Sequence, residues 1–146
     1  MIREMRLVDL PQILPIEKAS FSDPWTESTF VSAFELSPFF FGFVHEEEGE
    51  ILGYICGDAV LEDGQLMSVA TSPCHRKKGV AKGLIERFER ECVYRGATAC
   101  FLEVRVGNLP ALTLYESTGY ERIGIRKKYY PDGEDAFAMK KTLSKE

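Results

Sequence analysis

The sequence lacks any apolar run that approaches the ~18 residues of a membrane-spanning helix. Its first residues are charged and are soon interrupted by Asp9 and Pro11, which does not fit a secretory signal peptide. We therefore expect a cytoplasmic protein that has no membrane as a partner.

Cysteine and histidine are scarce. The four cysteines are Cys56, Cys74, Cys92 and Cys100, no two of them form a CxxC pair, and the two histidines lie far from a zinc-ligand pattern. We expect reduced, mostly buried thiols that behave as small hydrophobic side chains. The sequence therefore predicts neither a metal site nor a disulfide framework.

An excess of positive charge is also missing, because the formal net charge is −5. General nucleic-acid binders usually carry a basic surface, since neutralising phosphates drives their affinity. We therefore expect no direct nucleic-acid partner.

The length and composition are those of a globular chain. The 146 residues suit one domain over 1–146, and 45% hydrophobic with 28% charged residues argue against disorder. We predict a mixed α/β (α+β) fold, because several adjacent strands lack a helix between them, unlike a doubly wound nucleotide fold. The expected strands are 2–7, 39–45, 51–59, 64–71, 99–105, 121–128 and 135–142. The expected helices are 9–20, 26–36, 79–95 and 108–118, with capping residues or glycines at their ends.

The segment Arg76 to Lys82, between a predicted strand and the clearest helix, is typical of an anion site. The first turn of a helix has unpaired N–H groups, and the helix dipole adds positive potential there. Gly79 and Ala81 are small enough to let an anion approach the backbone. The segment ends without Gly-Lys-Ser/Thr, so it is not a nucleoside-triphosphate loop. The alternative is an ordinary basic helix start.

Arg76-Lys77-Lys78-Gly79-Val80-Ala81 resembles the Q/R-x-x-G-x-G/A signature of GNAT acetyltransferases. The strand around Glu103, the Asn108–Tyr115 helix and the Tyr-Tyr-Pro loop at 129–136 narrow the match. Together they are similar to the ribosomal-protein-alanine N-acetyltransferases, and the resemblance covers nearly the whole chain. It implies the GNAT acyl-CoA N-acyltransferase fold, in which helices flank a central, mostly antiparallel sheet with a splayed strand pair.

The same resemblance implies acetyl-CoA as the co-substrate and assigns its contacts. Its pantetheine arm is expected on the backbone of Val69, Ala70 and Thr71. Asn108 is expected to contact the coenzyme at a position further along the bound molecule. The pyrophosphate is expected on Lys77, Lys78, Gly79, Val80, Ala81 and Lys82. Ala81 departs from the commoner glycine, so its methyl group could tighten the approach of the pyrophosphate.

By this resemblance, Glu103 corresponds to the general base of the family and Tyr115 corresponds to its general acid. A carboxylate can take a proton from an amine, directly or through one water, and a tyrosine hydroxyl can donate to the leaving thiolate. From the residues alone other readings stay open: Glu103 could pair with Arg105 or a neighbouring strand, and Tyr115 could be a core tyrosine.

The acceptor is expected to be the N-terminal α-amine of a protein, and the resemblance implies the N-terminal alanine of a small-subunit ribosomal protein. An α-amine has a pKa of roughly 7.7–8.0, against ~10.4 for lysine, so it is easier to deprotonate at neutral pH. Trp25 and Tyr130 are candidate acceptor contacts, although both could merely pack. Two alternatives remain: an acetyltransferase for lysine or a small metabolite, and a coenzyme A-binding module without catalysis.

Overall fold

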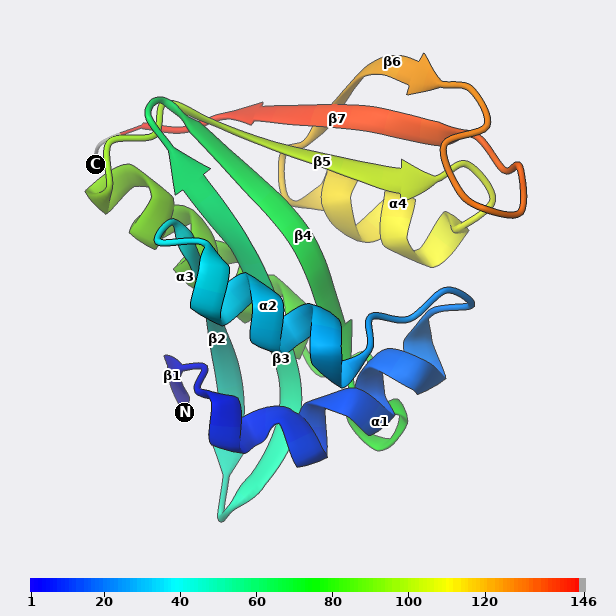
Figure 1. Cartoon of the computed structure of the whole chain (residues 1–146). Coiled ribbons are helices and arrows are strands. Elements are labelled where there is room, and N and C mark those ends of the chain that lie inside the picture. Colours follow the sequence, from blue (N-terminus) through cyan, green and yellow to red (C-terminus); the bar gives the residue numbers. More distant parts are fainter. Residues whose placement is uncertain (145–146) are drawn as a thin grey trace.

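The computed structural model describes residues 1–144, which form a seven-stranded sheet with helices on both faces (Figure 1). The strands are β1 (Ile2–Glu4), β2 (Phe40–Glu47), β3 (Glu50–Val60), β4 (Asp63–Thr71), β5 (Ala99–Arg105), β6 (Glu121–Arg126) and β7 (Ala136–Thr142). The helices are α1 (Leu10–Ser20), α2 (Glu27–Leu36), α3 (Val80–Tyr94) and α4 (Leu109–Ser117), with short 3-10 turns at Leu7–Asp9 and Pro73–His75.

The strand order is β1-β2-β3-β4-β5-β7-β6. Every neighbouring pair is antiparallel except β4 and β5, which run parallel. Two-residue turns join β2 to β3 and β3 to β4, which is why these strands need no helix between them. The mixed α/β, mostly antiparallel fold predicted from the sequence is confirmed.

The β4–β5 pair is splayed. The two strands pair only at Asp63↔Ala99, Gly64↔Cys100 and Gln65↔Phe101, and beyond these positions they diverge (Figure 1). From Leu66 to Thr71, β4 therefore has a sheet neighbour on the β3 side only, among the residues that the structure describes. The sheet is left with a wedge-shaped opening in its middle.

Two hydrophobic clusters, one on each face, hold the helices on the sheet. In Figure 1, α1 and α2 cover β2 to β4 from the front, while α3 and α4 lie behind the sheet. The front cluster is built around Ile13, Phe30 and Tyr54, and the rear cluster around Leu84 and Phe88, all of which are fully buried. Burying apolar surface on both faces is the main stabilising contribution to such a layered fold.

Local signals in the sequence set the helix ends. Thr26 accepts a hydrogen bond from the Thr29 N–H at the start of α2, and Asn108 accepts one from the Ala111 N–H at the start of α4. Gly96 and Gly119, which follow α3 and α4, have φ values of 102° and 105°, a region that favours glycine. The predicted helices are therefore found within one or two residues of their expected bounds.

The first strand is shorter than predicted. It ends at Glu4, and Leu7 belongs to a 3-10 turn rather than to the strand. The side chain of Asp9 makes no capping bond to α1; it accepts hydrogen bonds from both terminal nitrogens of Arg3 and from the Arg6 N–H. This carboxylate therefore closes the turn before α1.

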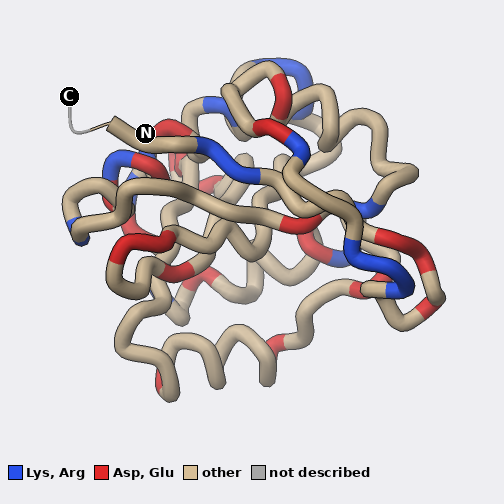
Figure 2. The backbone as a smooth tube through the Cα atoms, turned by 90° about the horizontal axis from the view of Figure 1, so that it is seen from above, with Lys and Arg blue, Asp and Glu red and all other residues tan. Residues whose placement is uncertain are grey.

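Charged residues of both signs are interspersed along the backbone (Figure 2). Within residues 1–144, no helix is both long and apolar enough to cross a membrane.

Candidate functional site

The inner edge of β4 offers free backbone groups to the wedge. The Ser72 N–H donates to the Leu52 carbonyl, and Tyr54 lies opposite Ala70 in the same antiparallel register. Because hydrogen-bonded pairs alternate in such a ladder, the N–H and C=O of Ala70 point toward β3. Those of Val69 and Thr71 point into the wedge. Of the three predicted pantetheine contacts, Val69 therefore turns both its N–H and its C=O toward the wedge, whereas Thr71 offers only its N–H, because its carbonyl accepts from Arg76 Nε. Ala70 uses its own groups in the sheet.

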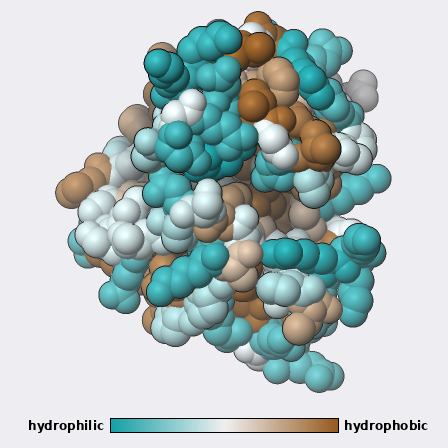
Figure 3. All heavy atoms as spheres, turned by 90° about the vertical axis from the view of Figure 1, so that its right-hand side faces the viewer, coloured by the Kyte–Doolittle hydropathy of each residue, from teal (hydrophilic) through white to brown (hydrophobic). Residues whose placement is uncertain are grey.

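A β-bulge lies where the strands begin to part. Ser68 pairs with Cys56 and Leu66 pairs with Gly57, so Met67 is the extra residue, and its side chain is 40% exposed. Bulges bend a strand and are common beside active sites. The face toward which β4 and β5 diverge is hollowed and has hydrophobic residues within the hollow (Figure 3).

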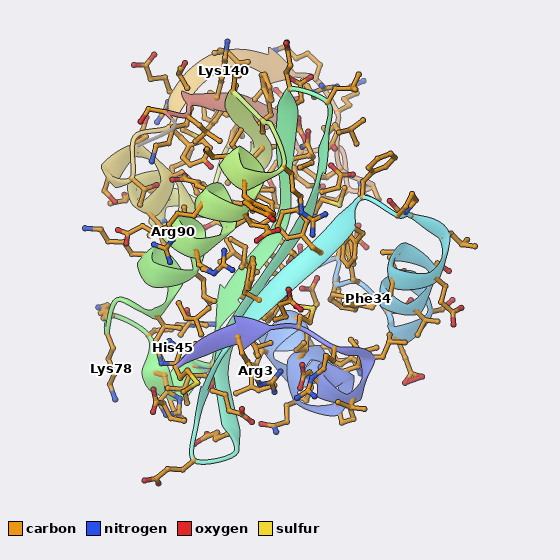
Figure 4. The ribbon with its side chains drawn as sticks, turned by 90° about the vertical axis from the view of Figure 1, so that its left-hand side faces the viewer. Arg3, Phe34, His45, Lys78, Arg90 and Lys140 are labelled. Atoms are coloured by element: carbon orange, nitrogen blue, oxygen red, sulfur yellow. The ribbon has the colours of Figure 1, made fainter. Side chains whose placement is uncertain are left out.

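The loop before α3 has the shape expected of an anion site. Lys77 and Gly79 adopt positive φ values of 65° and 79°, and α3 begins at Val80. A Cβ built on Gly79 would meet no atom within 4 Å, so the space over this backbone is open. Lys77, Lys78 and Lys82 are exposed, and Lys78 points away from the protein (Figure 4). Val80 is buried in the rear cluster, so only its backbone N–H can serve an anion.

Arg76 does not join the three exposed lysines. Its Nε donates to the Thr71 carbonyl over 3.2 Å, and a terminal nitrogen donates to Ser20 Oγ over 3.1 Å. The side chain thus ties the end of β4 to the last residue of α1.

Asn108 is the N-cap of α4 and Tyr115 lies within this helix, which runs beside β5 (Figure 1). Asn108 Oδ1 caps the helix, which leaves the amide nitrogen of this side chain for another partner. Tyr115 is 8% exposed and packs edge to face against Tyr120, with ring centroids 6.0 Å apart. Burial raises the pKa of Tyr115 well above its ordinary value, so the hydroxyl stays protonated.

Glu103 lies on β5 just beyond the point where the strands separate. Its carboxylate accepts a hydrogen bond from Gln65 Nε2 over 3.2 Å and lies 3.5 Å from Arg126 Nε, and its side chain is 16% exposed. Of the alternatives left open from the residues, pairing with Arg105 is wrong, because Arg105 bonds to Asp132 and Glu134, whereas pairing with a neighbouring strand is found in the bond from Gln65 on β4. Gln65 sits at the vertex of the wedge, so it fixes the carboxylate there.

Tyr130 is close enough to both candidate catalytic residues to interact with them electrostatically. Burial, the neighbouring Tyr129 hydroxyl and the charge of Glu103 raise the pKa of Tyr130 to about 12, against an opposing effect of Arg105. Tyr130 in turn contributes to the raised pKa of Tyr115. The structure thus brings Glu103, Tyr115 and Tyr130 into one neighbourhood.

Arg105 orders the loop that carries Tyr130, a role that the sequence did not reveal. Its guanidinium lies 4.1 Å from the Tyr130 ring centroid and donates to Asp132 and Glu134. The second carboxylate oxygen of Glu134 accepts from the Gly107 N–H. These partners are 25 to 29 residues away from Arg105, so no local pattern could have found them.

Trp25 is a packed residue. Its ring lies 5.0 Å from Phe30 and 6.2 Å from Phe40 between centroids, and its backbone N–H donates to Glu17. These contacts support the packing interpretation of Trp25.

A family model described as "Acetyltransferase (GNAT) family" matches residues 10–120. A Bacillus subtilis protein, provisionally named a [ribosomal protein bS18]-alanine N-acetyltransferase, is 37% identical over 145 residues, with 98% of this chain and 95% of the relative covered.

Two Escherichia coli comparisons agree with that relationship. The [ribosomal protein bS18]-alanine N-acetyltransferase of strain K12 is 33% identical over 146 residues, with 98% of this chain and 97% of the relative covered. The crystal structure of the ribosomal-protein-S18-alanine N-acetyltransferase from Escherichia coli matches with a TM-score of 0.89 at 32% identity, and covers 100% of this chain and 95% of its own.

Proposed function

This chain belongs to the acetyltransferase (GNAT) family, and on that premise we propose that it acetylates the N-terminal alanine of a small-subunit ribosomal protein. As a family member it is an acetyl-CoA-dependent N-acetyltransferase. The observation that carries the proposal is the Glu103 carboxylate, held at the vertex of a wedge whose other wall is the open edge of β4.

The residues along the wedge fit acetyl-CoA. The N–H and C=O of Val69 and the N–H of Thr71, which point into the wedge, suit the amides of a pantetheine arm, which runs like an added strand. The open backbone over Gly79 and the three exposed lysines suit a pyrophosphate. When bound, acetyl-CoA supplies an acetyl group activated as a thioester.

Glu103 is proposed as the general base. The acceptor must attack as a neutral amine, and a half-buried carboxylate can take its proton directly or through one water. Gln65 and Arg126 hold the carboxylate from two sides, which limits the number of orientations that it can adopt. Free N–H groups on β4 can polarise the reacting carbonyl.

Tyr115 is proposed to stabilise the leaving sulfur. Burial raises its pKa, whereas a cysteine-like thiol has a pKa of only ~8.5. Complete proton transfer from Tyr115 to the thiolate is therefore uphill, and its hydroxyl acts first as a hydrogen-bond donor to the developing negative charge.

An α-amine fits this base better than a lysine side chain does. The pKa difference of about 2.5 units corresponds to roughly 3 kcal/mol of additional deprotonation cost for lysine at ~1.36 kcal/mol per unit. The relatives' names also specify an alanine N-terminus. We place the reaction in the cytoplasm, with a protein acceptor and with neither nucleic acid nor membrane as a direct partner.

The test is acetylation of a peptide that begins with the alanine N-terminus of that ribosomal protein, followed by mass spectrometry. We expect the acetyl group on the α-amine. Turnover on a free small amine or on lysine, without α-amine acetylation, would show that the acceptor is wrong.

The Glu103→Gln variant tests the proposed base, with Glu121→Gln on exposed strand β6 as the matched control. Loss of a general base should lower kcat/KM by about 10²–10⁴-fold, whereas the control should match the parent. If acetyl-CoA binds but neither parent nor variant turns over on a broad amine panel, a non-catalytic coenzyme A module is the better description.

A further inference from the structure

Glu17 is a buried carboxylate that the proposed mechanism does not use. It lies on α1 at 2% exposure, among the residues of the front cluster. Within residues 1–144 it has no salt bridge to a lysine, arginine or histidine. Burying a charge without a cation is unfavourable, so its hydrogen bonds must offset the cost.

The two carboxylate oxygens of Glu17 serve different parts of the molecule. Oε1 accepts hydrogen bonds from the Tyr54 hydroxyl on β3 and from Ser68 Oγ on β4, the latter over 3.0 Å. Oε2 accepts from the backbone N–H of Trp25 over 2.9 Å. Burial and the charge of Glu17 raise the pKa of Tyr54, which keeps its hydroxyl protonated as a donor.

A second contact fixes the same connecting segment at its other end. Ser20, the last residue of α1, accepts from Arg76, whose Nε also donates to the Thr71 carbonyl on β4. The segment between α1 and α2, residues 21–26, is thus tied to β4 near both ends: through Arg76 at Ser20 and through Glu17 and Ser68 at Trp25.

This α1–α2 segment lies at the open end of the wedge. In Figure 1 it extends to the right past the end of β4, on the side toward which β4 and β5 diverge. The loop between β6 and β7, which carries Tyr130, reaches the same side from above. We expect an acceptor that approaches Glu103 from this side to contact both segments.

We infer that Glu17 is a positioning residue for the acceptor: through Trp25 it locks the α1–α2 segment onto the strand that is proposed to hold pantetheine. The inference rests on the proposed function. Loss of Glu17 should affect the binding of the acceptor and not that of acetyl-CoA. Glu17 acts on the acceptor side of β4, and its loss leaves the coenzyme-facing edge at Val69 and Thr71 unchanged.

The variants Glu17→Leu and Glu17→Gln distinguish this role from a merely structural one. Leucine fills similar volume and accepts no hydrogen bond, so the Trp25 N–H is released. Glutamine keeps one acceptor for that N–H, while the hydroxyls of Tyr54 and Ser68 can rotate and accept from its amide. Replacing a buried charge by an apolar side chain is often neutral or stabilising, so Glu17→Leu is expected to stay folded.

Trp25 is the only tryptophan, so its fluorescence reports on the segment directly. In Glu17→Leu we expect emission shifted to longer wavelength and stronger acrylamide quenching, with thermal stability equal to or above that of the parent. The KM for the acceptor peptide should rise about tenfold, the effect of losing one hydrogen bond to a charged group, while the KM for acetyl-CoA changes by less than about twofold. Glu17→Gln should restore both readouts.

Tyr54→Phe is the matched control, because it removes a donor from Oε1 but leaves the Oε2 contact with Trp25. It should keep the parent's emission and acceptor KM. The inference is overturned if Glu17→Leu keeps native emission and acceptor KM, or if it melts early and loses both substrates equally. The emission and the coenzyme affinity are measured without acceptor, so failure of the proposed ribosomal substrate leaves them interpretable. If Glu17→Leu does not fold, Glu17→Asp, whose shorter carboxylate cannot reach both sides, provides the same comparison.

Discussion

Glu103 and Tyr115 lie in different surroundings, which suit opposite roles. Glu103 keeps a hydrogen-bond donor in Gln65, a cation in Arg126 and partial access to solvent. Tyr115 is buried against Tyr120 and the rear cluster, where ionisation is disfavoured. One side chain is therefore placed to accept a proton and the other to donate a hydrogen bond.

Removing the hydroxyl of Tyr115 should affect chemistry more than folding. We expect Tyr115→Phe to lower kcat by roughly 10²-fold with little change in the KM for acetyl-CoA, because the ring contact with Tyr120 remains. Since burial raises the pKa of Tyr115, kcat of the parent should show no decline from tyrosine ionisation up to about pH 10. Steady-state kinetics over pH measure both effects. Tyr120→Phe is the control, and an equal loss of kcat there would contradict the assignment.

Asp9 should contribute stability that depends on pH. Burial alone raises its pKa, but hydrogen bonds from Arg3 and the Arg6 N–H outweigh burial, so the pKa lies below its usual value. The stabilisation is therefore complete above the unfolded pKa of ~3.9 and is lost as pH falls through the folded pKa. We expect Asp9→Asn to lower the free energy of unfolding by about 1.5–3 kcal/mol at neutral pH.

Urea unfolding of Asp9→Asn and its parent at several pH values checks this expectation. The difference should narrow below about pH 4, because asparagine does not titrate there. A difference that stays constant down to acid pH would show that the carboxylate charge is not responsible.

The residues that the sequence identified are those with strong local signals. Gly79, Asn108 and Tyr115 belong to short motifs, and the structure places Gly79 and Asn108 at the starts of α3 and α4 and Tyr115 within α4. Their roles at the site stay predictions. Glu17 was missed, because its partners Tyr54 and Ser68 are 37 and 51 residues away and only the folded sheet brings them together. Ala70 shows a further limit of prediction from the sequence, because the sequence does not reveal which backbone groups of β4 are already hydrogen-bonded within the sheet.

Among the elements, strand β4 pairs with β3 along one edge, and over its last residues its other edge has no strand partner in the described part of the chain. The alternation inferred from the Ser72–Leu52 bond leaves the amides of Val69 and Thr71 free and pairs that of Ala70 with Tyr54. Hydrogen exchange should therefore be fast at Val69 and Thr71 in the free protein and slow at Ala70. Coenzyme A should protect the first two and leave Ala70 unchanged, as measured residue by residue by NMR. Equal protection of all three without coenzyme would contradict the inferred edge.

Two glycines that flank α3 provide a matched pair of variants. Gly79 and Gly96, at opposite ends of this helix, both have positive φ, so alanine at either should destabilise the fold by roughly 1 kcal/mol or more. Only Gly79→Ala places a methyl group over the proposed pyrophosphate site. We expect it to weaken coenzyme A binding about tenfold by calorimetry, whereas Gly96→Ala binds like the parent. Equal affinities would exclude this loop from the site.

On the scale of the whole molecule, the sheet consists of two parts that share three residue pairs, β1 to β4 on one side and β5, β7 and β6 on the other. A ligand between them that binds only the folded state should stabilise it by about 2.7 kcal/mol at 100 times its Kd. We expect acetyl-CoA to raise the melting temperature accordingly. Replacing Lys77, Lys78 and Lys82 by alanine should reduce that rise, whereas Lys127→Ala on another exposed segment should not.

The shared vertex has a consequence for resistance to proteolysis. If acetyl-CoA binds along β4 as proposed, it adds a strand-like segment between two parts of the sheet that share only three residue pairs. A ligand that binds only the folded state lowers the population of open forms, and cleavage of a transiently opened protein follows that population. We therefore expect a protease to cleave the protein more slowly in the presence of acetyl-CoA.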